Sequence, residues 1–346
     1  MNLDENQTVV IHPTEPDGIG GFSYLAFDID NSCCTTESIS DAELVADILG
    51  IPFYVRDYKA IFKETVVDNF IDNYKNALTP NPCLICNRHI RFGTFLDEAM
   101  TMGAEYFATG HYARIKQNEQ GKYELWRGVD KSKDQSYVLH ALNQENLPHI
   151  LFPLGEYSKD EARQIGKRYK LPVFEKADSQ DLCFLGDDGQ RGFIRRHAPH
   201  ILKAGDIVNT KGEVLGQHIG LAAYTVGQRK GLGIIAREKM YVIKLNPIKN
   251  QLVIGTRNEL GSDELTAHSV TYISGCPLTE PTHVEGKIRY KSRLVPAMVT
   301  SLPNKRLHAK FEMPLPDITP GQGFVFYHGD KVLGGGTIER PCSISR

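Results

Sequence analysis

Two cysteines stand three positions apart in the stretch TPNPCLICNRHIRFG, residues 79–93. This CxxC spacing, at Cys83 and Cys86, is used by metal clips, by redox pairs and by nucleophilic thiols. A closed zinc site needs four ligands, commonly from a second CxxC or from two histidines, and the sequence contains no second CxxC. A thioredoxin-like redox pair starts a helix after a strand, which a segment punctuated by Pro80 and Pro82 after a long expected helix fits poorly.

The remaining thiols widen the choice of chemistry. The chain has seven cysteines, an odd number, and a disulfide framework is unusual in a large intracellular protein. Cys183 lies in the polar segment DSQDLCFLG and, with Cys83 and Cys86, would give a three-thiolate site for zinc or an iron–sulfur cluster. We interpret Cys276 and Cys342 as inert thiols.

A nucleophilic role for Cys86 is the third interpretation. Arg88, His89 and Arg91 follow it closely, and cationic neighbours favour the reactive thiolate form. A second reactive thiol at Cys183 would permit persulfide or disulfide exchange. The residues alone leave the metal and nucleophile interpretations open.

Strand-like and helix-like segments alternate in the first third of the chain. Short apolar runs indicate strands, and apolar residues at helical spacing indicate helices. This rhythm predicts an α/β fold, a parallel sheet with helices on both faces. Ligands bind at the carboxyl ends of such strands, here in the loops after Ile29, Val55 and Thr109. The expected strands cover residues 7–11, 22–29, 51–58 and 104–113, and the expected helices cover 38–50, 59–78 and 91–103.

The second half of the chain has a different pattern. Helical periodicity fades after about residue 196, where glycine-punctuated alternating runs predict hairpins. From about residue 270 onward, short strands predict a β-barrel or sandwich. A chain of 346 residues is long enough for two or three domains. We predict a catalytic α/β domain over 1–197, a small adapter over 198–262 and a C-terminal β-domain over 263–346.

The composition is that of a globular protein with near-neutral charge, −2. No apolar run approaches the ~20 residues of a transmembrane helix, and the acidic, polar N-terminus is not a signal peptide. We therefore expect a cytoplasmic protein. Net charge does not decide for or against a nucleic-acid partner, but basic clusters at 195–197, 227–231 and 287–293 would suit one.

Eight segments, in order along the chain, carry a resemblance to a known family. They are LTPNPCLICNRHIRFGTFLDEA, ATGHYAR, RGVDKSKDQSYVL, LFPLGEYSKDEAR, DSQDLCFLG, YTVGQRKGLGI, KIRYKS and ITPGQGFVFYHGDKVLGGGTI. Each is weak alone, but together they resemble the tRNA-specific 2-thiouridylase family of the MnmA type. The resemblance implies an adenine-nucleotide α-hydrolase-like catalytic domain, a small adapter domain and a C-terminal β-barrel that contacts tRNA.

The resemblance also implies a reaction. Such enzymes use ATP, with Mg²⁺, to adenylate the C2 oxygen of uridine 34 in tRNA, and then replace it with sulfur to give 2-thiouridine. By motif position Cys86 is the nucleophile and Cys183 carries the persulfide, and the two would be able to pair as a disulfide in the resting enzyme. A persulfide donor, either a cysteine desulfurase or a relay protein, is implied as a partner beside tRNA.

Further site residues follow from the same resemblance. Gly110 would lie against the nucleotide, where a glycine permits close approach, and Leu25 would lie near the adenine at the end of the second strand. Arginine and tyrosine suit phosphate contact and base stacking, and a flipped base is read by polar groups at its edge. The implied tRNA contacts are His111, Lys133, Asp134, Gln135, Arg289, Tyr290 and Gln322.

The chain departs from the family in two places. The family's pyrophosphate loop, SGGVDSS, holds phosphate on backbone N–H groups after the first strand, but here QTVVI is followed by HPTEPDGIGGF. Only residues 12–21 separate the first two expected strands, too few for a parallel crossover, so the first βα unit is expected to be lost or rewritten. The second departure is Cys83, where many members carry aspartate.

Several explanations stay open. The missing loop would reflect a disrupted N-terminus, a catalytically impaired tRNA-binding paralogue, or a variant that binds ATP otherwise. The additional thiol keeps a metal or iron–sulfur role for Cys83, Cys86 and Cys183 as the alternative to a persulfide relay.

Overall fold

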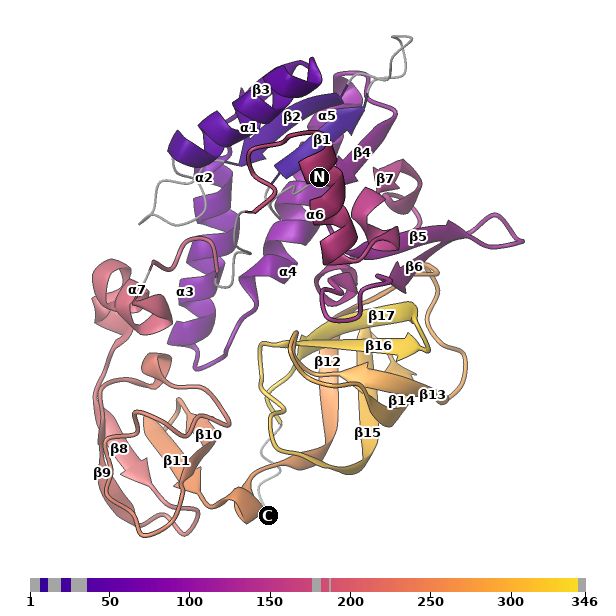
Figure 1. Ribbon diagram of the computed structural model, residues 1–346. Coiled ribbons are helices and arrows are strands. Elements are labelled where there is room, and N and C mark those ends of the chain that lie inside the picture. Colours follow the sequence, from indigo (N-terminus) through magenta and orange to yellow (C-terminus); the bar gives the residue numbers. More distant parts are fainter. Residues whose placement is uncertain (1–6, 12–19, 26–35, 176–181, 187, 342–346) are drawn as a thin grey trace.

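The chain folds into an α/β part, a small four-stranded sheet and a β-barrel (Figure 1). The computed structural model describes residues 7–11, 20–25, 36–175, 182–186 and 188–341. No helix in these ranges is long and apolar enough to cross a membrane.

The α/β part is built on a five-stranded sheet with the order β3-β2-β1-β4-β7. The predicted parallel sheet is confirmed, with one strand reversed. β2 is parallel to β3, and β4 is parallel to β7, but β1 runs antiparallel to both β2 and β4. The connection from β1 to β2, residues 12–19, is too short for the crossover helix that a parallel neighbour requires. The strands are β1 (Gln7–Ile11), β2 (Gly20–Leu25), β3 (Phe53–Arg56), β4 (Tyr106–Thr109) and β7 (Ile150–Leu151).

Helices cover both faces of this sheet, as predicted. Neighbouring residues of a strand point to opposite faces, and in β4 Phe107 packs into one core and Ala108 into another. The core around Ala108 includes Val45 and Ala46 of α1, and the core around Phe107 includes residues of α2 to α5. The helices are α1 (Thr36–Leu49), α2 (Lys59–Phe62), α3 (Asp68–Lys75), α4 (Pro82–Cys86), α5 (Leu96–Thr101), α6 (Lys159–Arg168) and α7 (Gly189–His197).

Two π-helical segments join these helices into longer rods. The first, η1 (Lys63–Val67), connects α2 to α3, so the helix predicted over 59–78 is one interrupted rod that ends at Lys75. The second, η2 (Asn87–Phe95), connects α4 to α5 and is kinked at Gly93. The short 3₁₀ segments are η3 (Ser136–Leu139), η4 (Leu147–His149), η5 (Pro153–Glu156), η6 (Pro199–Ile201), η7 (Leu221–Ala223) and η8 (Arg257–Glu259).

The C-terminal part is a closed β-barrel, which confirms the predicted all-β domain. Its strands follow the order β12-β15-β14-β13-β16-β17, and β17 pairs back with β12. Alternate residues point inward and form a separate core that contains Phe311, Phe324 and Phe326. The strands are β12 (Ser262–Tyr272), β13 (Thr282–Lys287), β14 (Val295–Leu302), β15 (Arg306–Leu315), β16 (Gly323–His328) and β17 (Lys331–Ile338).

Strand pairing also joins the β5–β6 hairpin to the barrel. A hairpin of β5 (Ala113–Gln117) and β6 (Tyr123–Arg127) extends the barrel sheet, because β6 pairs with β17 (Figure 1). The middle sheet has the order β10-β11-β8-β9, and its β8–β9 pair is the predicted hairpin. Its strands are β8 (Gly205–Val208), β9 (Val214–His218), β10 (Tyr241–Asn246) and β11 (Gln251–Gly255).

Candidate active site

Cys83 and Cys86 lie in the first turn of a helix, α4. The side chain of Asn81 caps this helix, because its Oδ1 accepts a hydrogen bond from the Cys83 amide at 3.1 Å. Pro82 occupies the first helical position, where the missing N–H needs no partner. The proline that argued against a helix start is therefore part of it. Cys83 is exposed, and Cys86 is half-buried.

The loop before α4 is held by the barrel and by the middle part. The Thr79 amide donates to the Pro320 carbonyl at 2.9 Å. The Gln322 side-chain amide donates to the carbonyls of Thr79 and Pro80, at 2.9 and 3.1 Å. The hydroxyls of Thr79 and Thr225 lie 2.6 Å apart. We call residues 76–86, from the end of α3 to the end of α4, the Cys86 loop. Its position therefore depends on all three parts of the chain.

Cys183 packs against the same hydrophobic core as Cys86. Both thiols are half-buried and border the core cluster that contains Phe70 and Phe184. Phe184, the residue after Cys183, is anchored by edge-to-face contacts with Phe70 and Phe193, at ring-centre distances of 5.1 and 5.2 Å. The structure thus brings two thiols that are distant in sequence to the border of one core.

His111 is enclosed in the interior, with 3% of its surface exposed. Burial, and then the charge of Arg91, hold its pKa well below the usual range, so the ring is neutral. Arginine only donates, so His111 Nε2 accepts from Arg91 Nη1 at 3.4 Å and Nδ1–H donates to Thr109 Oγ1 at 2.7 Å. Arg91 also donates to Asn87 Oδ1 at 3.0 Å, and Asn87 donates to the Val138 carbonyl at 3.1 Å.

The cationic residues after Cys86 contact other parts of the molecule. Arg91 contacts His111, as above, and Arg88 Nη2 donates to Thr271 Oγ1 on β12 at 3.2 Å. Burial lowers the pKa of Arg88, and burial with the Arg88 charge lowers the pKa of His89. Arg88 is thus a further link from the Cys86 helix to the barrel.

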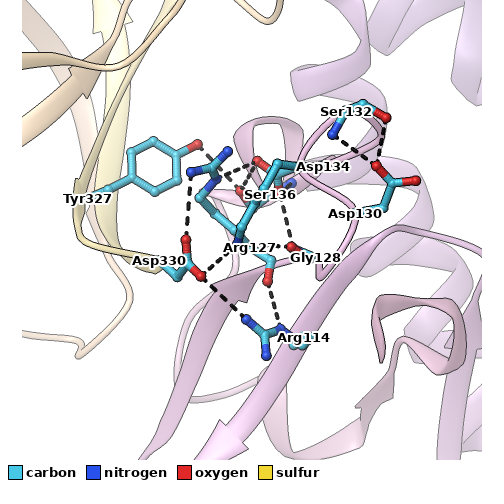
Figure 2. A network of polar contacts seen from close by, with 10 residues as sticks. Arg114, Arg127, Gly128, Asp130, Ser132, Asp134, Ser136, Tyr327 and Asp330 are labelled. Carbon is cyan, nitrogen blue, oxygen red and sulfur yellow. Dashed lines mark hydrogen bonds and ion pairs between the residues drawn. The ribbon is translucent and has the colours of Figure 1, made fainter. Parts of the chain in front are cut away.

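Asp134, a predicted tRNA contact, is the centre of a buried polar network (Figure 2). Only 2% of its side chain is exposed, and Arg127 Nε donates to its Oδ2 at 3.1 Å. Its Oδ1 accepts from the amides of Gly128 and Ser136, both at 3.2 Å. Arg127 also pairs with Asp330, at 3.6 Å, in the turn between β16 and β17. The carboxylate fixes the 128–136 segment against the barrel.

The two neighbours of Asp134 differ from each other in exposure. Gln135 is buried, and its side-chain Oε1 accepts from the Tyr112 main-chain N–H at 2.9 Å, while its main-chain N–H donates to the Tyr112 carbonyl at 3.0 Å. Lys133 remains partly exposed. Within this predicted trio, the side chain that solvent or a ligand reaches is therefore Lys133.

The predicted contacts in the barrel lie at its seams with the other parts. Arg289 donates to the Val226 carbonyl at 2.9 Å and to the Thr319 hydroxyl, and burial lowers its pKa. Tyr290 borders the same core as Cys86, and Lys287 Nζ lies 5.6 Å from the centre of its ring. These side chains therefore join the barrel to the middle part and to the core that Cys86 borders.

The two residues predicted to contact the nucleotide flank β1. Leu25 ends β2, and Gly110 follows β4, both at the carboxyl edge of the parallel strands. Ile11, the last residue of β1, pairs with Gly20 and Tyr106, the first residues of β2 and β4. A loop that follows β1 therefore starts from the opposite edge, so β1 does not supply a pyrophosphate loop in the family's position.

The described residues do not support the metal alternative. Among them, no group of three or more His, Cys, Asp or Glu side chains is arranged to hold a metal ion. Cys83, Cys86 and Cys183 all lie in this part of the chain and are not brought together in such a group.

Sequence reasoning missed Asn81 and Thr225. Asparagine directly before a proline is a recognisable helix-cap signal that would have identified Asn81. Nothing local to Thr225 indicates its contact with Thr79, because the two are 146 positions apart.

Comparison with protein families assigns all three parts. Family models match residues 23–187 (tRNA methyl transferase HUP domain), 191–256 (tRNA methyl transferase PRC-barrel domain) and 262–338 (aminomethyltransferase beta-barrel domain). The first model begins within β2, so β1 lies outside its match.

Individual relatives match over most of the chain. A tRNA-specific 2-thiouridylase MnmA from Pelotomaculum thermopropionicum is 45% identical over 90% of this chain and 85% of its own length. Those from Clostridioides difficile and Magnetococcus marinus are 43% and 45% identical over 90% and 89% of this chain, and 87% and 86% of their own lengths. The domain models mention methyl transfer, but these long matches are all to thiouridylases. The chain belongs to the tRNA-specific 2-thiouridylase family.

Proposed function

We propose that this chain is a tRNA 2-thiouridylase that transfers persulfide sulfur to C2 of uridine 34. Cys183 carries the persulfide, and Cys86 is the partner thiol. The observation that supports this assignment is that both half-buried thiols border one core. The relatives that match nine-tenths of the chain are thiouridylases.

The proposed sulfur step needs two thiols. The terminal sulfur of the Cys183 persulfide bonds to C2 of the uridine, and the activated C2 oxygen leaves. The Cys86 thiolate then attacks Cys183 Sγ, and the S–S bond to the transferred sulfur breaks. The products are 2-thiouridine and a Cys86–Cys183 disulfide, which two electrons must reduce before the next turnover.

The protein around the thiols positions the RNA in this proposal. Lys133 offers a partly exposed cation, which suits phosphate, and Tyr290 offers an aromatic ring at the border of the core that Cys86 also borders. Arg289 and Gln322 are further proposed tRNA contacts, whereas His111, Asp134 and Gln135 are buried and would act by holding the tRNA-binding segments in place. The donor is a persulfide-carrying protein, and the compartment is the cytoplasm.

A second candidate is a tRNA-binding paralogue that does not activate the base. The observation that favours it is the reversed β1, whose carboxyl end lies away from Leu25 and Gly110. Among the described residues, β1 does not place a loop where the family is expected to hold pyrophosphate, so no step through ATP is derived for this chain.

One experiment separates the two candidates. Purified protein is incubated with tRNA, a persulfide donor and ATP-Mg²⁺, and digested tRNA nucleosides are analysed by mass spectrometry alongside tRNA affinity. The thiouridylase forms 2-thiouridine, Cys183→Ser forms none, and the matched control Cys276→Ser retains the wild-type rate. tRNA binding without any 2-thiouridine would refute the first candidate in favour of the second.

A further inference from the structure

Cys83 is the thiol that the proposed sulfur transfer leaves without a role. It lies three positions before Cys86 in α4, and side chains at this spacing are neighbours on one face of a helix. Cα atoms three positions apart in a helix also lie within the range that a disulfide bridges. Cys83 and Cys86 are therefore placed to exchange thiol and disulfide forms with each other.

The two thiols differ in their access to solvent. Cys83 is exposed, whereas Cys86 and Cys183 are half-buried against the core. Thiol–disulfide exchange requires in-line approach to a sulfur atom, so its rate depends on access. A protein reductant reaches a disulfide at Cys83 more readily than one between two half-buried thiols.

We infer that Cys83 is a resolving thiol that passes the Cys86–Cys183 disulfide to the surface. The Cys83 thiolate attacks Cys86 Sγ, a Cys83–Cys86 bond forms, and the Cys86–Cys183 bond breaks. Cys183 leaves as a thiolate, ready to accept the next persulfide sulfur. An external dithiol protein of the thioredoxin class then reduces Cys83–Cys86, becomes a disulfide itself and returns both thiols. This inference rests on the thiol roles in the proposed function.

Hydrogen bonds hold the backbone that precedes the CxxC pair. Asn81 caps the helix at Cys83, and Gln322 holds the preceding carbonyls of Thr79 and Pro80. The CxxC turn is thus anchored on its N-terminal side, while the Cys83 side chain stays exposed.

The test uses the whole protein without tRNA or ATP. After mild oxidation and blocking of thiols, trypsin releases residues 76–88, which contain Cys83 and Cys86, and residues 177–191, which contain Cys183. A Cys83–Cys86 bond lies within the first peptide, whereas a bond to Cys183 links the two peptides. We expect the internal bond in wild type and the linked peptides in Cys83→Ser. Linked peptides alone in wild type, or no disulfide in either protein, would overturn the inference.

Reduction kinetics provide the second readout. Thioredoxin is expected to reduce oxidised wild type at least about tenfold faster than oxidised Cys83→Ser, because only the wild type offers an accessible sulfur. A small phosphine reductant is expected to reduce both at the same rate, and Cys276→Ser serves as the control for removal of an exposed thiol. Equal thioredoxin rates would overturn the inference. Because tRNA and ATP are absent, this result is independent of whether the chain forms 2-thiouridine.

Discussion

Gln322 offers a direct test of how the barrel positions the Cys86 loop. The resemblance assigns this side chain to tRNA, but in the structure its amide donates to the carbonyls of Thr79 and Pro80. Gln322→Ala removes both hydrogen bonds. Each contributes about 0.5–1.5 kcal/mol net, so the ordered loop should lose about 1–3 kcal/mol. At about 1.4 kcal/mol per factor of ten, open loop conformations become about 5- to 150-fold more populated.

The loop's own amides report this change. The Thr79 N–H is bonded to the Pro320 carbonyl, so its hydrogen exchange in the 76–88 peptide should accelerate by the same factor in Gln322→Ala. The rate of 2-thiouridine formation should fall with it, because small displacements of a reacting group cost large factors in rate. Gln217→Ala, which truncates an exposed glutamine on β9, should change neither quantity.

A second variant perturbs the same contact from the backbone. Gly321 has a φ of +94°, and a Cβ there would lie 2.9 Å from the amide nitrogen and the carbonyl oxygen of Thr79. Gly321→Ala should therefore accelerate the same exchange while it keeps the Gln322 amide. Unchanged exchange in both variants, with weaker tRNA binding in Gln322→Ala, would refute a positioning role and leave Gln322 as an RNA contact only.

Three further outcomes follow from the structure. Burial lowers the pKa of His140 to about 4, below its value in the unfolded chain. The contribution of the neutral ring to the free energy of unfolding is therefore present above pH 6.5 and is lost as pH falls towards 4. At about 1.4 kcal/mol per pKa unit this is about 3 kcal/mol, and urea unfolding of His140→Gln should show a pH dependence weaker by that amount. Arg127→Met, which leaves the Asp134 carboxylate buried without its cation, should lower unfolding free energy by about 3–5 kcal/mol; Asp330→Asn, at a partly exposed carboxylate, should cost less than about 1 kcal/mol. Replacing residues 1–22 with the N-terminal segment of the Pelotomaculum relative should raise ATP–pyrophosphate exchange by about 100-fold or more; an unchanged rate would show that β1 does not limit activation.

Much of the fold follows from local patterns in the sequence. Alternation of period two predicts the barrel strands, and helical spacing predicts the rods around the sheet, because each pattern reflects one buried face. The reversal of β1 is also encoded locally, since residues 12–19 are too few for a crossover. The π-helical segments were not predictable, because their residues have the same apolar spacing as an α-helix.

The contacts of the site residues are harder to read from sequence. A polar run such as that around Asp134 is typical of an exposed loop, but Arg127 on β6 and Tyr327 on β16 enclose it from elements that meet only in the fold. Gln322 reaches its partners across more than 240 positions. The family resemblance points to such residues, whereas their partners are set by how the barrel docks.

Sulfur transfer and base activation, the two steps of the proposed reaction, depend on different parts of the molecule. The Cys86 loop is fixed by Gln322 and Pro320 from the barrel and by Thr225 from the middle part, whereas β1 pairs with β2 and β4 within the α/β sheet. The contacts that position the thiols therefore do not run through β1. We therefore expect a change in the first βα unit to alter base activation without disturbing the thiol pair. The sulfur chemistry of this chain can then be tested by itself, and the N-terminal graft tests base activation while the sulfur-transfer site stays intact.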